Sequence, residues 1–229
     1  MIPGEIMKKI LLIFLCLNTA SAAQVKVGLL GGINHSNIFS DKSITPKFTS
    51  TNNAAIGGII NLDLFDSFSL LLEPGYIEKG ADYNFPSDLK TIFSLSMSYI
   101  EIPMLLKYTT GGIIRPYLIA GPILGVNLSS ELEMEIAGFH VNVETKDMTR
   151  TINIGLALGC GLEYTTERIN LFIETRYNYS FNDISKPGML KINFIDSTFR
   201  ENINENPNLN IRSFQFLFGF LLPITTLKN

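Results

Sequence analysis

Phenylalanine occupies every second position from Phe214 to Phe220, and this repeat constrains the chain more than any other feature. A period of two belongs to a β-strand, whose successive side chains point to opposite faces of the sheet. A row of phenylalanines exposed to water would be unfavourable, so this face requires either a protein core or lipid.

Similar alternation recurs along the chain and predicts eight strands. We place them at 25–34, 54–65, 68–80, 93–108, 114–129, 149–164, 168–180 and 210–223. Tight turns at 66–67, 109–113 and 165–167 alternate with long polar segments at 35–53, 81–92, 130–148 and 181–209. Transmembrane barrels have short periplasmic turns and longer external loops. The pattern therefore predicts an all-β fold, an eight-stranded antiparallel up-and-down transmembrane β-barrel.

The first 23 residues have the features of an export signal. Lys8 and Lys9 precede an apolar run from Ile10 to Leu17, and Ala20-Ser21-Ala22 has the small-residue pattern of a cleavage site. Cleavage could follow Ala22 or Ala23; an uncleaved anchor is the alternative. We expect residues 1–23 to be a signal peptide, residues 24–229 to form the barrel domain, and the protein to reside in a bacterial outer membrane.

Composition agrees with a membrane barrel. Charged residues make up 17% of the 229 residues and hydrophobic residues 46%, whereas about 25% charged is usual for soluble domains. The net charge of −3 offers no basic surface for nucleic acid. Proline removes a backbone donor, so we expect the prolines within the strands to lie at bulges or strand ends: Pro74, Pro103, Pro116 and Pro122.

Charged residues fall on the strand faces opposite the apolar ones, which predicts a polar network inside the barrel. Its members, besides Lys26, are Asp63, Glu73, Glu101, Lys107, Glu163, Glu174 and Arg176. Both signs occur, so the charges can pair, and an eight-stranded interior is just wide enough for side chains to fill. We interpret the network as a structural plug; a proton or ion path is the alternative.

Two segments, Ser98–Tyr108 and Arg115–Gly125, carry a family resemblance. Together with the glycine-rich stretch Gly155–Glu163, they resemble the small porin-family or PorT-like outer-membrane β-barrel proteins of Bacteroidota. The resemblance implies an eight-stranded barrel, and most members of that family have no assigned activity.

Residues that could carry catalysis or bind a metal are few. The two histidines, His35 and His140, lie in expected external loops, and Cys160 is expected to face lipid. We therefore predict no catalytic, cofactor or metal site. We expect most tyrosines to form a girdle at the membrane interfaces: Tyr76, Tyr99, Tyr108, Tyr117, Tyr164, Tyr177 and Tyr179.

These observations predict a monomeric, non-enzymatic protein with a structural or interaction role. Its partners would be outer-membrane lipid and a protein that contacts the external loops, where 191–199 suggests a hairpin. Three alternatives stay open: a soluble lipocalin-like periplasmic ligand-binding barrel, a small outer-membrane pore, and an enzyme that modifies lipid. A soluble binder would need its apolar faces inside, whereas a membrane barrel needs them outside.

Overall fold

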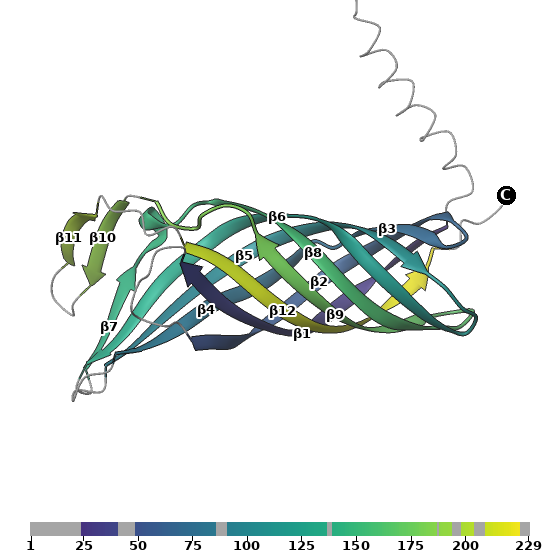
Figure 1. The fold of residues 1–229 in the computed structure, drawn as a ribbon, viewed down its shortest axis with the longest axis horizontal. Coiled ribbons are helices and arrows are strands. Elements are labelled where there is room, and N and C mark those ends of the chain that lie inside the picture. Colours follow the sequence, from purple (N-terminus) through teal and green to yellow (C-terminus); the bar gives the residue numbers. More distant parts are fainter. Residues whose placement is uncertain are drawn as a thin grey trace, which may run out of the picture.

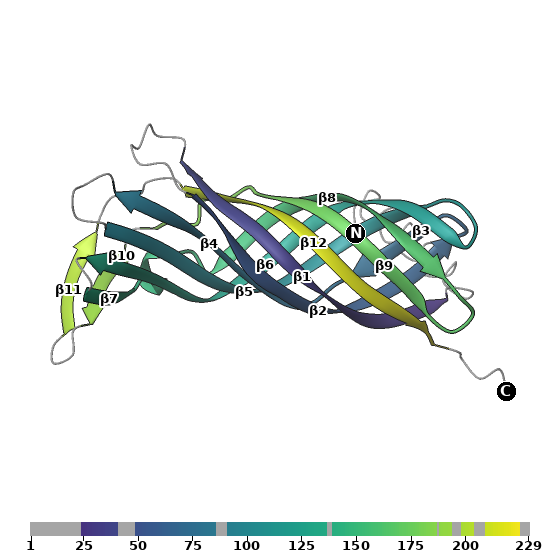
Figure 2. The same ribbon diagram turned by 90° about the horizontal axis from the view of Figure 1, so that it is seen from below.

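The computed structural model describes residues 24–40, 49–85, 91–136, 139–186, 188–193, 198–203 and 209–224. The expected signal segment, residues 1–23, lies outside this part of the chain. The described residues form a long barrel of antiparallel strands, with tight turns at one end and a small additional sheet at the other (Figures 1 and 2).

Eight strands close the barrel wall, as the sequence predicts, with β3 and β4 counted as one interrupted strand. They are β1 (Val25–Ser40), β2 (Thr49–Phe65), β3 (Phe68–Leu72) continued by β4 (Gly75–Phe85), β5 (Thr91–Thr109), β6 (Ile114–Ile136), β8 (Ile152–Thr165), β9 (Asn170–Ser180) and β12 (Leu209–Pro223). The first and last strands pair in an antiparallel ladder that runs from Lys26 opposite Pro223 to Ser40 opposite Leu209. This ladder leaves no open edge between the two ends of the chain.

Several strands extend further than the sequence predicts at the end opposite the tight turns. β1 continues to Ser40, and β6 continues to Ile136, well into the segment expected to be a loop. The extended part of β6 keeps a period of two, with Leu132 and Met134 between the exposed Glu131 and Glu133, and its ladder with β5 continues to Ile136. The loop expected there follows from the charged residues, whereas the period of two indicates a strand.

Three short strands add a flap to the loop end. β7 (Phe139–Glu144) pairs with the end of β6, and β10 (Gly188–Asn193) pairs with both β7 and β11 (Thr198–Ile203). A single turn of 3-10 helix, η2 (Lys146–Met148), follows β7. The β10–β11 hairpin confirms the one expected within the last long loop. It lies at the end of the barrel opposite β3 (Figure 1).

The opposite end of the barrel consists of short connections, as expected. Asp66-Ser67 joins β2 to β3, and the amide of Thr109 bonds the carbonyl oxygen of Ser67 at 2.8 Å. Gly111 in the next turn has φ of 97°, a left-handed conformation that favours glycine. None of the helices in the described residues has the length and apolar character needed to span a membrane.

Side chains alternate between an apolar outer face and a buried inner face. On β12, Phe216 is 51% exposed whereas its neighbour Leu217 is 2% exposed. The apolar faces of β2, β5, β8 and β9 are exposed in the same way, and the exposed Leu29 and Leu118 orient β1 and β6, whose apolar residues outline no single face in the sequence. Exposed leucine, isoleucine and phenylalanine therefore surround the barrel, the reverse of a soluble ligand-binding barrel.

The prolines fit the wall in two ways. Pro74 separates β3 from β4, and Pro116 lies near the start of β6, as expected for bulges and strand ends. Pro103 and Pro122 instead lie inside β5 and β6, contrary to the expectation. There the β5–β6 register has no paired residues between Pro103–Ile123 and Leu106–Ala120, so the ladder skips the position where Pro122 could not donate.

Placing a charge on the outer face tests this orientation. We expect Phe216→Arg to destabilise the protein in lipid vesicles by about 2–4 kcal/mol, because arginine near the bilayer midplane loses hydration. Asn210→Arg, at the loop end of the same strand, should cost only about 0–1 kcal/mol. Denaturant unfolding measures both; equal, small effects would contradict a lipid-facing surface.

Candidate functional site

The centre of the barrel contains a buried cluster around Arg176 of β9. Its Nη2 donates to Glu73 Oε2 at 2.7 Å, and its Nε donates to Glu174 Oε1 at 2.8 Å. Glu174 also accepts a hydrogen bond from the Tyr117 hydroxyl at 3.0 Å. Glu174 and Arg176 are two residues apart on one strand, so both point inward. All four side chains lie in positions at most 4% exposed, and two carboxylates share one guanidinium.

Glu73 lies on the inward face at the break between β3 and β4, and its amide bonds the carbonyl oxygen of Pro103 at 3.1 Å. Its Oε1 atom is buried and has no hydrogen-bond partner. Odd-numbered residues face inward on both sides of Pro74, so this carboxylate meets Arg176 from the opposite wall.

A second layer of ion pairs lies toward the tight turns. Lys107 pairs with Glu163, and Lys26 pairs with Asp63 at 2.8 Å. Both carboxylates also accept hydrogen bonds from neighbouring side chains. Asn170 donates to Glu163 at 3.0 Å, while Asn61 and Ser69 donate to Asp63 at 2.6 and 2.8 Å. The Lys107 ammonium also lies 4.2 Å from the centre of the Tyr117 ring, which links this layer to the central cluster.

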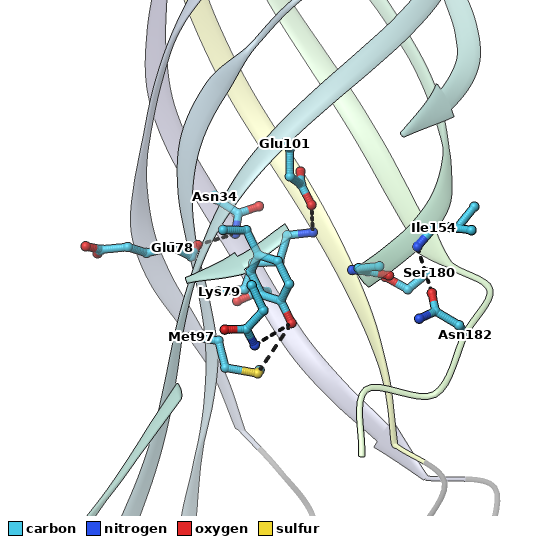
Figure 3. A network of polar contacts seen from close by, with 12 residues as sticks. Asn34, Glu78, Lys79, Met97, Glu101, Ile154, Ser180 and Asn182 are labelled. Carbon is cyan, nitrogen blue, oxygen red and sulfur yellow. Dashed lines mark hydrogen bonds and ion pairs between the residues drawn. The ribbon is translucent and has the colours of Figure 1, made fainter. Parts of the chain in front are cut away.

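A third layer lies toward the loop end (Figure 3). Lys79 of β4 donates to Glu101 of β5 at 2.6 Å, and both side chains are buried. Tyr99 lies beside them, with its ring 5.5 Å from the Lys79 ammonium and its hydroxyl near Asn127 at 3.4 Å. The interior is therefore crossed by paired charges at three levels.

Side chains of β1 replace backbone bonds that β4 loses near this layer. The β2–β4 register is interrupted between Ser50 and Ala55. Asn34 donates to the carbonyl oxygen of Glu78 at 2.8 Å, and Ser36 bonds both the amide and the carbonyl of Gly80. Polar residues on the inner face of β1 thus satisfy a stretch of wall that lacks its neighbour.

Apolar side chains share the interior with the polar network expected there. Ile59, Leu71 and Leu105 pack with Tyr117 and Phe172 in one cluster. A second cluster includes Ile184, which follows β9 and is 2% exposed among interior residues at the loop end. An eight-stranded barrel has an interior narrow enough to pack like a core, so apolar contacts are favourable there as well.

Part of the interior at the turn end stays unfilled. A cavity of about 530 Å³ opens there, with Lys26, Asp63, Lys107, Arg115 and Glu163 among its lining residues. The layer of Lys107 and Glu163 forms its floor, because Tyr117 and the central cluster lie beyond them.

All seven residues of the expected network point into the interior, and each belongs to an ion pair. The sequence reading missed Lys79, although continuing the odd-numbered face of Glu73 across Pro74 would have found it. It also placed Tyr99 and Tyr117 in an interfacial girdle; that prediction is wrong, because both are buried inside the barrel. Tyr108, Tyr164, Tyr177 and Tyr179 do lie on the outer face.

Other candidate residues are scattered. Cys160 is exposed on the outer face of β8, as expected, and its sulfur lies 3.6 Å from the Thr175 hydroxyl. His35 is exposed and contacts Asn52 at 2.8 Å, whereas the side chain of His140 lies outside the described part. In the residues described, no three histidine, cysteine, aspartate or glutamate side chains form a group that could hold a metal ion.

Comparison with known families identifies the family to which this barrel belongs. Residues 19–186 match the family model described as the outer membrane protein β-barrel domain. The chain belongs to this family. Membership places the protein in the bacterial outer membrane as an integral barrel, and the exposed apolar wall faces lipid there. No curated protein sequence matches the chain.

Solved outer-membrane barrels share the fold at low sequence identity. OprG from Pseudomonas aeruginosa is 16% identical with a TM-score of 0.50, covering 87% of this chain and 95% of its own. Neisserial surface protein A is 14% identical with a TM-score of 0.43, covering 89% and 100%. A major outer membrane protein from Thermus thermophilus is 9% identical with a TM-score of 0.49, covering 89% and 100%. OprG supports the fold alone.

Removing the shared cation tests the central cluster. We expect Arg176→Met to destabilise the folded barrel by about 3–5 kcal/mol, because Glu73 and Glu174 would remain buried without their partner. Arg168→Met, in an exposed turn, is the matched control and should change stability by less than about 0.5 kcal/mol. Adding Glu73→Gln and Glu174→Gln to Arg176→Met should recover most of the loss. Equal stabilities for the two single variants in denaturant unfolding would refute the cluster's role.

Proposed function

We propose that this protein is a monomeric, non-enzymatic outer-membrane barrel with a plugged lumen and a structural or interaction role. We further propose that it is one of the porin-family or PorT-like barrels of Bacteroidota, exported by a signal peptide at residues 1–23. The loop end then faces the exterior and the tight turns face the periplasm, the arrangement typical of such barrels.

The observation that carries the plugged lumen is the central cluster. Glu73 and Arg176 come from opposite parts of the wall and meet at 2.7 Å inside the barrel. Ion pairs lie on both sides of this contact, at Lys107–Glu163 and at Lys79–Glu101, and apolar side chains fill the levels between them. A hydrated ion would have to break these contacts and their packing in order to pass.

The arrangement of polar residues favours a role without catalysis. The charges of the central cluster, Glu73, Glu174 and Arg176, bond one another, and none of them lines the cavity at the turn end. Ser36 and His35 are neighbours in sequence, but Ser36 is fully buried inside the barrel and His35 is exposed outside. Adjacent strand residues point to opposite faces, so these two cannot act as a pair.

The flap of β7, β10 and β11 supports an interaction role. It continues the β5–β6 wall beyond the level where β8 and β9 end, so one side of the barrel rises above the other. Such an extension is unnecessary for closing the barrel, and loops and extensions of this kind are where barrels carry recognition. A protein partner would meet this surface outside the cell.

Conductance distinguishes a plug from a pore. Wild-type protein inserted in a planar lipid bilayer should show no steady conductance, whereas a variant with Glu73→Ala, Tyr117→Ala, Glu174→Ala and Arg176→Ala should conduct if it folds. Insertion is checked by the shift of the folded band on a gel after boiling. Steady single-channel currents through wild-type protein would favour the pore and exclude the plug.

A further inference from the structure

Arg212 on β12 is a cation on the outer wall with two aromatic rings beside it. Its guanidinium carbon lies 4.4 Å from the centre of the Phe39 ring and 5.3 Å from that of Tyr179. Its Nε atom is buried and has no hydrogen-bond partner. Within the described part of the chain it forms no ion pair with a carboxylate.

Arg212 lies where the apolar outward row of β12 ends. Phe214, the next outward residue toward the turns, is 49% exposed and continues the phenylalanine row. Asn210, the next outward residue toward the loop end, is polar. The guanidinium is therefore at the boundary between hydrocarbon and headgroups, on the side that faces outward under the orientation proposed above.

The charge distribution around the barrel isolates this arginine. Among the described outward positions of β8, β9, β12 and β1, Arg212 is the one residue that carries a full charge. Acidic side chains instead belong to the opposite side of the ring, on β4, β6 and β7: Glu78, Asp82, Glu131, Glu133 and Glu144. The outer face of these four strands therefore carries the positive charge of Arg212 and no acidic side chain among its described outward residues, at the border of the outer leaflet.

A further donor lies next to Arg212 across the β1–β12 seam. Asn37 is its register partner on β1, and the Asn37 side-chain oxygen accepts the amide of Ile38, so its amide nitrogen can face outward. The N–H groups of a guanidinium and an amide together suit a phosphate.

We propose that Arg212 and Asn37 form a binding site for the phosphate of an outer-leaflet lipid headgroup. The rings of Phe39 and Tyr179 hold the guanidinium by cation–π contact at a fixed depth. The phenylalanine row below would then contact the acyl chains of the same lipid. The inference rests on the proposed orientation of the barrel.

The experiment uses the full chain folded in a non-ionic detergent. Native mass spectrometry would measure binding of bisphosphorylated lipid A and of the same lipid A with its phosphates removed. Wild-type protein should prefer the phosphorylated form by about fivefold, the scale expected for one arginine near a charged membrane surface. Arg212→Gln should reduce the preference to less than about twofold, and Arg168→Gln at the turn end should leave it unchanged.

Two additional arms make the result decisive. Tyr179→Leu keeps the charge of Arg212 but removes one ring, and it should give an intermediate preference; it also serves if Arg212→Gln fails to fold. Inorganic phosphate at millimolar concentration should not displace the lipid. Unchanged preference in Arg212→Gln, or in Tyr179→Leu where the former does not fold, would overturn the site. Full displacement by inorganic phosphate would overturn its assignment to a lipid. The boiling shift reports the folded barrel independently of both.

Discussion

The closed backbone ladder is the constraint on which the rest of the structure depends. Lipid offers no hydrogen bonds, so every amide and carbonyl in the membrane must find a partner within the protein. The β1–β12 pairing supplies the last set of partners. Where the wall is irregular, at the β2–β4 interruption, Asn34 and Ser36 provide the missing bonds from the inner face of β1. The irregularities are tolerated because polar side chains compensate for them.

Closure of eight strands also determines the interior. The space is narrow, so inward side chains from opposite walls must touch, and charged ones must find opposite charges. Arg176 between Glu73 and Glu174 is the clearest case, because residues of β9, of β6 and of the β3–β4 break meet there. The same narrowness explains why apolar residues such as Leu105 and Phe172 share the interior with the ion pairs.

Much of this architecture follows from the sequence, because adjacent residues of a strand point to opposite faces of the sheet. Parity separates the two faces of β9 and β12, and the low charged fraction of the chain favours an interior location for the face that holds Arg176. Parity cannot say which inward residues meet across the barrel, because that depends on strand tilt and stagger. The loop-end parts of β1 and β6 are predicted as loops because they carry polar residues, although the period of two continues in β6 as far as Ile136. The sequence wrongly predicts Tyr99 and Tyr117 at the membrane interface, because tyrosine suits both an interface and a buried site where its hydroxyl is hydrogen-bonded.

The central claim is that adjacent residues of one strand face lipid and the barrel interior. The chain contains no tryptophan, so a single introduced tryptophan reports its own surroundings. Tyr108 is exposed on the outer face of β5, and Thr109 lines the cavity at the turn end. In vesicles, brominated lipid should quench the fluorescence of Tyr108→Trp and spare Thr109→Trp, which aqueous iodide should reach instead. Equal quenching of both by brominated lipid, or the opposite order, would contradict the account.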